Sequence, residues 1–188
     1  SSSLVAVHNA CSSLRNKECN MAIVCGSRLH LVPLDDKRYK IGIESSDGIT
    51  RTFDETSDGS GYGEGVGVIL LKPLNKALRD GDMIHAVIKG SAINQDGTSL
   101  GLTAPNPKSQ EKVIVDAWER AKINPEKFSY IECHGTGTKL GDPIEIDALT
   151  KAFSKFTGKK QFCAVGSLKS NIGHLLDCSG IAGLIKVV

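Results

Sequence analysis

The sequence predicts a mixed α/β protein in which a layered sheet is flanked by helices, and three observations support this fold class. Apolar residues recur at helical spacing in several segments. Short apolar runs bounded by glycine or other turn residues stand between those segments. From residue 84 onward the two patterns alternate regularly, and such alternation is typical of layered α/β folds.

Residues 1–75 contain one predicted helix and two predicted strands. The helix has its first turn at residues 1–3 and one apolar stripe at intervals of three and four residues, formed by Leu4, Val7, Cys11 and Leu14. The runs MAIVCG (21–26) and VGVILLK (66–72) predict buried strands. The polar stretch 35–65 between them carries turn signals and predicts a loop that could line a cleft.

The remaining residues predict three further strands and three further helices. The strands are expected at 84–92, 128–133 and 162–167, and the helices at 107–121, 142–153 and 179–188. In the second of these helices Asp142 is the expected N-cap, Pro143 the first helical residue and Glu145 its partner in a capping box.

Both ends of the chain are predicted to be cut from a larger fold. The first helix lacks the strand that a βα unit places before it. The last helix is expected to leave an apolar face uncovered, formed by Ile181, Leu184, Ile185 and Val188.

The composition excludes several classes of protein. Charged residues make up 23% of the chain and its formal net charge is only +2, which argues against a nucleic-acid or anionic-lipid partner. The six cysteines show no C-x-x-C spacing, which favours free thiols, many of them buried, in a reducing compartment such as the cytoplasm. We find neither a signal peptide nor an apolar run long enough for a membrane span.

Two histidines stand in glycine-rich connections that follow predicted strands. They are His134 in ECHGTGTKLGDPIE and His174 in GSLKSNIGHLLDC. Sites in α/β folds collect at the carboxyl ends of strands, so the two rings could together stabilise an oxyanion, with Lys169 tuning their protonation. The alternative is that each histidine is only a structural hydrogen-bonding group.

Two other motifs suggest binding sites at first sight, but their context argues against both. GSGYGEGVG is followed by a strand rather than a helix, so a dinucleotide site is not expected and turns or a bulge are favoured. Cys133 beside His134 lacks a second Cys/His pair at tetrahedral spacing, so no metal site is predicted.

Four longer stretches resemble one family. RTFDETSDGSGYGEGVGVILLKPL, SAINQDGTSLGLTAPN, ECHGTGTKLGDPIE and SLKSNIGHLLDCSGIAGLIK occur in the same order as in the β-ketoacyl synthase (ketosynthase) domains of modular polyketide synthases. The resemblance spans residues 1–188 and implies a thiolase-like α/β/α/β/α fold, here incomplete. Residues 1–75 would be the end of the first half of that fold and residues 76–188 most of the second.

The resemblance also implies where the nucleophile lies. The family's catalytic cysteine sits in a D-T-A-C-S-S-S-L motif at the start of a buried helix, and the SSSL of this chain begins at Ser1. The nucleophile would therefore immediately precede Ser1. Cys11 is expected to be an unactivated thiol on the apolar stripe of that helix.

By the same resemblance, His134 and His174 promote decarboxylation of a malonyl thioester and stabilise the enolate. Lys169 would keep the second histidine in order, and Glu145 would either pair with that lysine or only cap its helix. The remaining residues carried over are a supporting Asn171 and the pantetheine-contacting Thr136 and Thr138.

The expected activity of the parent domain is a decarboxylative Claisen condensation on thioesters carried by the phosphopantetheine of an acyl carrier protein. The domain would bind no cofactor of its own and would form a homodimer, and this chain alone would be inactive. Two alternatives remain. One is a non-catalytic module that docks carrier proteins or dimerises, and the other is an acyl hydrolase that uses Cys11 with His134.

Overall fold

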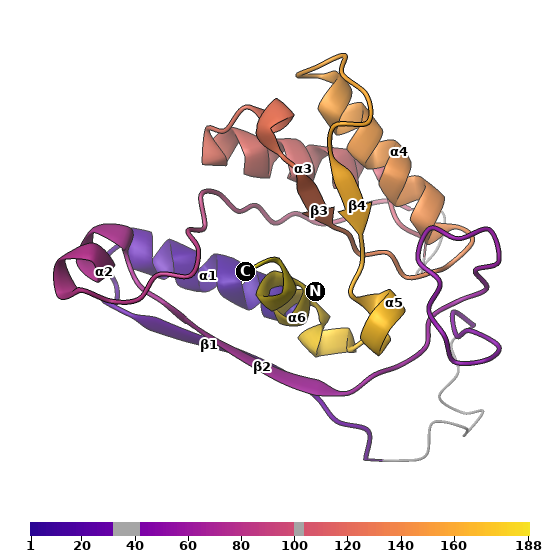
Figure 1. Cartoon of the computed structure of the whole chain (residues 1–188), viewed down its shortest axis with the longest axis horizontal. Helices are drawn as coiled ribbons and strands as arrows, with labels where there is room; N and C mark the ends of the chain where they lie inside the picture. Colours follow the sequence, from indigo (N-terminus) through magenta and orange to yellow (C-terminus); the bar gives the residue numbers. More distant parts are fainter. Residues whose placement is uncertain (32–41, 100–103) are drawn as a thin grey trace.

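The computed structural model describes residues 1–31, 42–99 and 104–188 and contains two small sheets (Figure 1). Strands β1 (Ala22–Arg28) and β2 (Gly65–Leu71) form an antiparallel ribbon, in which Val24 pairs with Ile69. Strands β3 (Tyr130–Glu132) and β4 (Ala164–Gly166) pair in parallel. All four strands lie where the sequence predicts them. The predicted loop at 35–65 lies partly outside the described residues.

All four predicted helices are present, and the structure adds two short helices, at 74–80 and 169–172, that the sequence analysis did not predict. Helix α1 covers Ser2–Arg15, and the remaining helices are α2 (Leu74–Asp80), α3 (Pro107–Ala121), α4 (Gly141–Ser154), α5 (Lys169–Ile172) and α6 (Ser179–Val187). Short 3-10 turns occur at η2 (Pro125–Lys127) and η3 (Leu176–Cys178). The side chain of Asn106 caps α3 by accepting hydrogen bonds from the amides of Lys108 and Ser109.

One hydrophobic core, in the lower part of Figure 1, lies between the β1–β2 ribbon and helices α1 and α6. Both helices cover the same face of the ribbon. Its centre is Ile181 of α6, which is fully buried beside Val7 and Val24. A Cβ at Gly26 or Gly67 would lie 3.0 or 2.9 Å from Ile181 Cγ2. The two glycines therefore allow α6 to approach the ribbon closely.

In the upper part of Figure 1, aromatic rings pack between α3 and α4 and hold the two helices together. Trp118 of α3 lies 4.6 Å from Phe153 of α4 and 5.2 Å from Phe128, measured between ring centroids. Phe162, which leads into β4, stands edge-on to Phe153 at 5.2 Å. These contacts pack α3 against α4 and join both helices to the segments that lead into β3 and β4.

One predicted strand is wrong. Residues 84–92 form no strand, and no ladder partner lies beside them among the residues that the structure describes. Several of the apolar residues in and next to this segment are exposed, including Met83, Ile84 and Val87. Apolar and β-branched residues confer a preference for extended backbone, but a strand needs a neighbouring backbone to receive its hydrogen bonds.

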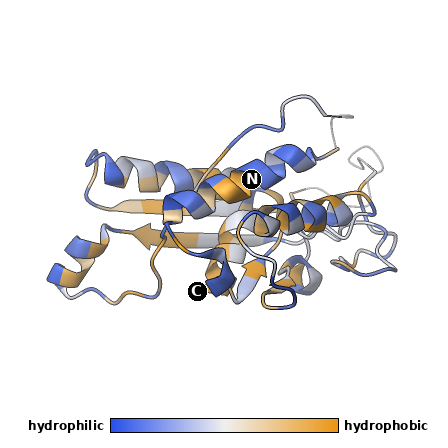
Figure 2. Ribbon diagram, turned by 90° about the horizontal axis from the view of Figure 1, so that it is seen from above, coloured by the Kyte–Doolittle hydropathy of each residue, from blue (hydrophilic) through white to orange (hydrophobic). Residues whose placement is uncertain are grey.

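The expected uncovered face of the last helix is only partly present. Ile181 is buried in the core, while Ile185 and Val188 are exposed. A second uncovered apolar surface lies on the ribbon, whose outer face carries Ile23, Cys25, Val66, Val68 and Leu70. The strands are accordingly hydrophobic or neutral along much of their length, whereas the helices alternate between hydrophilic and hydrophobic stretches (Figure 2).

Among the described residues no helix combines the length and the apolar character that crossing a bilayer requires.

The buried position of Ile181 leads to a stability prediction. Ile181→Ala should lower the free energy of unfolding by about 3 kcal/mol, because it leaves a cavity between α6 and the ribbon. Ile185→Ala, on the exposed side of the same helix, should cost less than about 1 kcal/mol. Urea unfolding followed by circular dichroism measures both, and equal losses would contradict the placement of α6.

Candidate active site

The two histidines of the sequence analysis meet in the structure. His134 follows β3 by two residues, and His174 follows β4 after the short helix α5. The backbone continues the parallel pairing past β3, since the amide of Cys133 donates to the carbonyl of Gly166 at 2.7 Å. The ring centroids of His134 and His174 are 5.5 Å apart and the rings are nearly perpendicular, at 86°. The predicted convergence of these two loops is thus confirmed in geometry.

The protonation of His174 is set by its neighbours. The backbone amide of Leu176 donates to its Nδ1 at 3.0 Å, and Ser179 Oγ lies 2.9 Å from the same nitrogen. Because a backbone amide can only donate, Nδ1 accepts and the neutral ring carries its proton on Nε2. Burial, and then the charge of Lys169, lower the pKa of His174 to about 4. His174 is therefore a neutral imidazole with an Nε2–H donor.

His134 is held by its backbone rather than by its ring. Its amide donates to Glu145 Oε1 at 2.6 Å, and its carbonyl accepts from Lys169 Nζ at 2.6 Å. The residue is exposed to solvent, although nearby protein atoms partly desolvate its ring. This desolvation, followed by the charges of Lys169 and His174, places the pKa of His134 well below its usual value.

Lys169 is a buried cation at the first position of α5. Burial lowers its pKa, and the carboxylates of Glu145, Glu132 and Asp142 oppose that shift. The predicted pairing of Glu145 with Lys169 is wrong as a direct contact, since no ion pair joins these two residues, both of which the structure describes. The lysine instead donates to the His134 carbonyl, and the carboxylates act on it through their field.

The capping box predicted for α4 is also wrong. The helix begins at Gly141 and its N-cap residue, Leu140, makes no side-chain cap. Glu145 Oε2 accepts the amide of Gly135 at 2.8 Å, in addition to the bond that Oε1 accepts from His134. A carboxylate near the start of a helix can accept amides of the preceding loop, and here Glu145 accepts two of them.

Asp142 holds the same loop from the other side. Its Oδ1 accepts the amide of Gly137 at 3.0 Å and its Oδ2 that of Phe53 at 2.8 Å. Gly135 and Gly137 have φ values of +46° and +68°, which favour glycine. The HGTGT loop therefore has a left-handed backbone at its glycines, which they adopt without strain, and two carboxylates of α4 hold it in place.

A third segment, residues 59–63, braces both histidine loops, and the sequence analysis missed this role. Ser60 Oγ donates to the carbonyl of Thr136 at 2.6 Å. The amide of His174 donates to Gly61 O at 2.7 Å, and the amide of Gly63 donates to His174 O at 3.2 Å. The glycines of GSGYG were the available signal, because a Cβ at Gly61 or Gly63 would overlap a facing backbone carbonyl.

The remaining predicted site residues are less central. Thr136 is mostly buried, and its hydroxyl lies 3.1 Å from that of Thr138. Thr138 also accepts the amide of Gly141 at the start of α4. Asn171 is exposed on α5, and its side chain forms no hydrogen bond within the described part of the chain. The structure thus assembles His134, His174, Lys169 and Glu145 around one loop and leaves Asn171 at the surface.

The thiols differ from one another. Cys11, Cys133 and Cys178 are buried, whereas Cys25 is exposed, against the general expectation of buried thiols. Burial raises the pKa of Cys11, and burial together with Glu145 raises that of Cys133 to about 12. Neither is a thiolate at neutral pH.

The described residues contain no group of three or more His, Cys, Asp or Glu side chains that could hold a metal ion.

The sequence comparisons identify the family to which this chain, with its two histidine loops at the ends of parallel strands, belongs. The family model described as "Beta-ketoacyl synthase, N-terminal domain" matches residues 1–77, and "Beta-ketoacyl synthase, C-terminal domain" matches residues 85–188. The chain belongs to the β-ketoacyl synthase family.

Its relatives are polyketide synthases. It is 54% identical over 189 residues to polyketide synthase PksM of Bacillus subtilis (strain 168), covering 100% of this chain and 4% of the relative. It is 50% identical over 188 residues to polyketide synthase PksL of the same organism, again covering 100% and 4%. The chain thus spans only a small part of the curated relatives that it matches.

Solved structures confirm the thiolase-like fold class. The ketosynthase from module 6 of the bacillaene synthase of Bacillus subtilis 168 matches with a TM-score of 0.94 at 49% identity, covering 98% of this chain and 33% of that structure. Ketosynthase twelve of the bacillaene polyketide synthase in Bacillus amyloliquefaciens matches with a TM-score of 0.93 at 44% identity, covering 99% and 34%. The chain corresponds to about a third of a solved ketosynthase.

The buried ring of His174 leads to a pH prediction. Its pKa falls from the usual 6.5 to about 4 on folding, so between these pH values the unfolded chain binds a proton that the folded chain does not. The stabilising contribution is present above pH 6.5 and is lost as the pH falls toward 4.

Urea unfolding of wild type should therefore show a loss of stability over this range, to which His174 contributes up to about 1.4 kcal/mol per pH unit. His174→Gln should flatten the slope, and His85→Gln, at an exposed residue, should leave it unchanged. The same slope in wild type and His174→Gln would contradict a buried neutral ring.

Proposed function

We propose that this chain supplies the two-histidine part of a ketosynthase active site, which decarboxylates a malonyl thioester and condenses the enolate with an acyl thioester. The observation that carries the proposal is the pair His134 and His174, with ring centroids 5.5 Å apart and both rings neutral. Two neutral imidazoles at this separation can donate hydrogen bonds to one oxygen without giving up a proton to it.

In the decarboxylation step the bond between the malonyl carboxylate and its α-carbon breaks, and CO₂ leaves. The electron pair moves into the α-carbon and the thioester carbonyl, whose oxygen becomes an enolate oxygen. His174 would donate to this oxygen through Nε2–H, because its Nδ1 already accepts from Leu176. His134 would be the second donor, and the charge of Lys169 would keep both rings neutral and the local potential positive.

In the condensation step the enolate carbon attacks the carbonyl carbon of an acyl thioester on a cysteine. A carbon–carbon bond forms, the carbon–sulfur bond breaks, and the thiolate leaves as the β-ketoacyl thioester is released. By family resemblance that cysteine immediately precedes Ser1. The first turn of α1 lies beside the segment that follows His174, since Ser2 Oγ donates to Asp177 Oδ1 at 3.1 Å. This contact and the positive end of the helix dipole support the assignment.

The thioesters would arrive on the phosphopantetheine arm of an acyl carrier protein, with Thr136 and Thr138 contacting the arm. We propose a cytoplasmic homodimer as the parent enzyme, without a bound cofactor. A purely non-catalytic docking module would have no need to hold two neutral histidines and a buried lysine at such cost in desolvation.

Replacing either histidine tests the reaction. In a full-length ketosynthase domain that contains residues 1–188, His134→Ala and His174→Ala should each lower condensation at least about a hundredfold, because each removes a donor to the enolate oxygen. Release of CO₂ from malonyl thioester and formation of the β-ketoacyl product are measured separately. His85→Ala, at an exposed residue, should retain activity. Condensation that survives both active-site replacements would refute the proposal.

Acyl loading separates the proposal from a hydrolase that uses Cys11. The 188-residue chain is incubated with a short acyl-pantetheine thioester, and peptide mass spectrometry maps any acylated cysteine. We expect no stoichiometric adduct on Cys11 or Cys133, because burial raises the pKa of both thiols. A full adduct on Cys11 would favour the hydrolase instead.

A further inference from the structure

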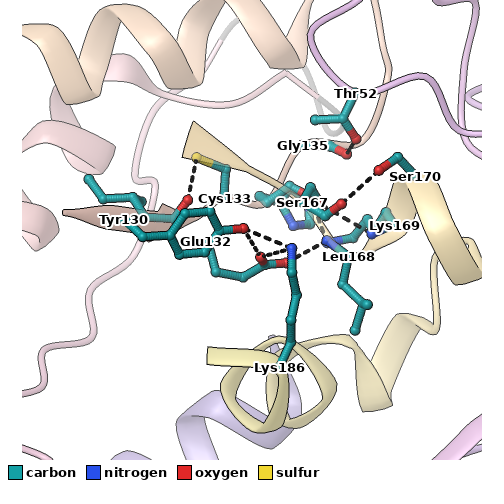
Figure 3. A network of polar contacts seen from close by, with 12 residues as sticks. Thr52, Tyr130, Glu132, Cys133, Gly135, Ser167, Leu168, Lys169, Ser170 and Lys186 are labelled. Atoms are coloured by element: carbon teal, nitrogen blue, oxygen red, sulfur yellow. Dashed lines mark hydrogen bonds and ion pairs between the residues drawn. The ribbon is translucent and has the colours of Figure 1, made fainter. Parts of the chain in front are cut away.

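Glu132, the last residue of β3, is the centre of a polar network outside the histidine pair (Figure 3). Its Oε1 accepts the backbone amide of Leu168 at 2.6 Å. Its Oε2 accepts from Lys186 Nζ and from the hydroxyl of Tyr130, both at 2.7 Å. The lysine also lies 2.7 Å from the Tyr130 hydroxyl. Both carboxylate oxygens are therefore engaged, and the side chain is fixed from three directions.

On one side the network holds the turn that presents Lys169. Leu168 directly precedes α5, a helix of only 4 residues that has no side-chain cap. With the Leu168 amide bound to Glu132, the next residue extends Nζ to the carbonyl of His134 at 2.6 Å. Ser167 Oγ also donates to that carbonyl, at 3.3 Å. Glu132 thus acts on the histidine loop through Leu168 and Lys169.

On the other side the network reaches α6 and, through it, the first turn of α1. Lys186 lies on α6, and the amide of Ile181 on the same helix donates to Ser3 Oγ at 3.1 Å. Gly183 faces the carboxylate, since a Cβ there would lie 3.2 Å from Glu132 Cγ. In Figure 1, α6 lies between the ribbon and the β3–β4 pair, and Figure 3 shows Lys186 reaching from α6 to Glu132.

The charge of Glu132 also matters. Burial opposes its ionisation, but the bonds from Lys186, Tyr130 and the Leu168 amide outweigh burial and lower its pKa. Three carboxylates favour the charged form of Lys169, in the order Glu145, Glu132 and Asp142. The charge of Lys169 in turn lowers the pKa of the two histidines. Glu132 therefore helps to keep Lys169 protonated.

We propose that Glu132 is a positioning residue for the condensation reaction: together with Lys186 it holds Lys169 against the His134 loop and fixes that loop relative to the first turn of α1. This inference rests on the proposed function. Glu132 does not touch the substrate in this arrangement, so its loss should reduce turnover rather than binding of the malonyl thioester.

The test compares variants of a full-length ketosynthase domain that contains residues 1–188. Glu132→Gln should lower kcat about 10- to 100-fold and leave KM for malonyl thioester within about twofold, because the reacting groups are displaced while the binding surface remains. The alkaline limb of the pH profile should move to lower pH, since Lys169 loses a neighbouring carboxylate. Lys186→Met, which keeps the Leu168 bond, should lower kcat by a smaller factor.

The matched control is Glu111→Gln. Glu111 of α3 pairs with Lys155 at 2.6 Å, and its side chain is about as enclosed as that of Glu132, at 19% against 12% exposed. Its removal should leave kcat and the pH profile unchanged. Urea unfolding of each variant gives the folded fraction, to which all rates are normalised.

The outcomes separate the two proposals. The proposed function would be refuted if the wild-type domain showed no condensation activity. It would also be refuted if condensation activity survived replacement of both histidines. Neither outcome depends on the Glu132 variant. Wild type with condensation and a Glu132→Gln variant of unchanged kcat and pH profile would overturn the positioning role. If Glu132→Gln does not fold, Lys186→Met and Tyr130→Phe decide, and unchanged kcat in both would overturn it.

Discussion

The site depends on hydrogen bonds to main-chain groups of three loops that are distant in sequence. Residues 59–63 bind the His134 loop through Ser60 and the His174 backbone through Gly61 and Gly63. Backbone bonds are short and directional, so they set the separation of two rings more precisely than contacts between long side chains would. They are available here only because glycines leave room for one backbone to approach another.

The charged groups around this frame serve two purposes at once. Glu145 and Asp142 hold loop amides directly, and their negative charge also offsets the cost of burying Lys169. Neither carboxylate forms an ion pair with the lysine, whose Nζ donates to the His134 carbonyl. Burial, and then the same lysine charge, lower the pKa of both imidazoles.

Helix α6 connects the two layers of the molecule. Ile181 anchors it in the lower core, and Lys186 ties it to the end of β3. The start of α1, where the family's nucleophile is expected, and the loops that carry the histidines belong to different layers. A ketosynthase must hold these parts in register through two chemical steps, and α6 is the element that contacts both.

The sequence by itself determined four of the helices, four of the strands and the identity of the two histidine loops, because these depend on local periodicity and on glycine-rich connections. Helices α2 and α5, of 7 and 4 residues, are too short to show a clear helical period. Tertiary structure alone decided the rest. Residues 84–92 have strand-like composition, yet pairing depends on a neighbour that local pattern does not report. Asp142 and Glu145 have the spacing of a capping box, but their oxygens accept amides of a loop that only the folded chain brings near. The Nε2–H form of His174 depends on the Leu176 amide, which a local turn brings to Nδ1. The role of Glu132 depends on the Leu168 amide, which is distant in sequence. In both cases the geometry of the folded chain decides which donor the side chain binds.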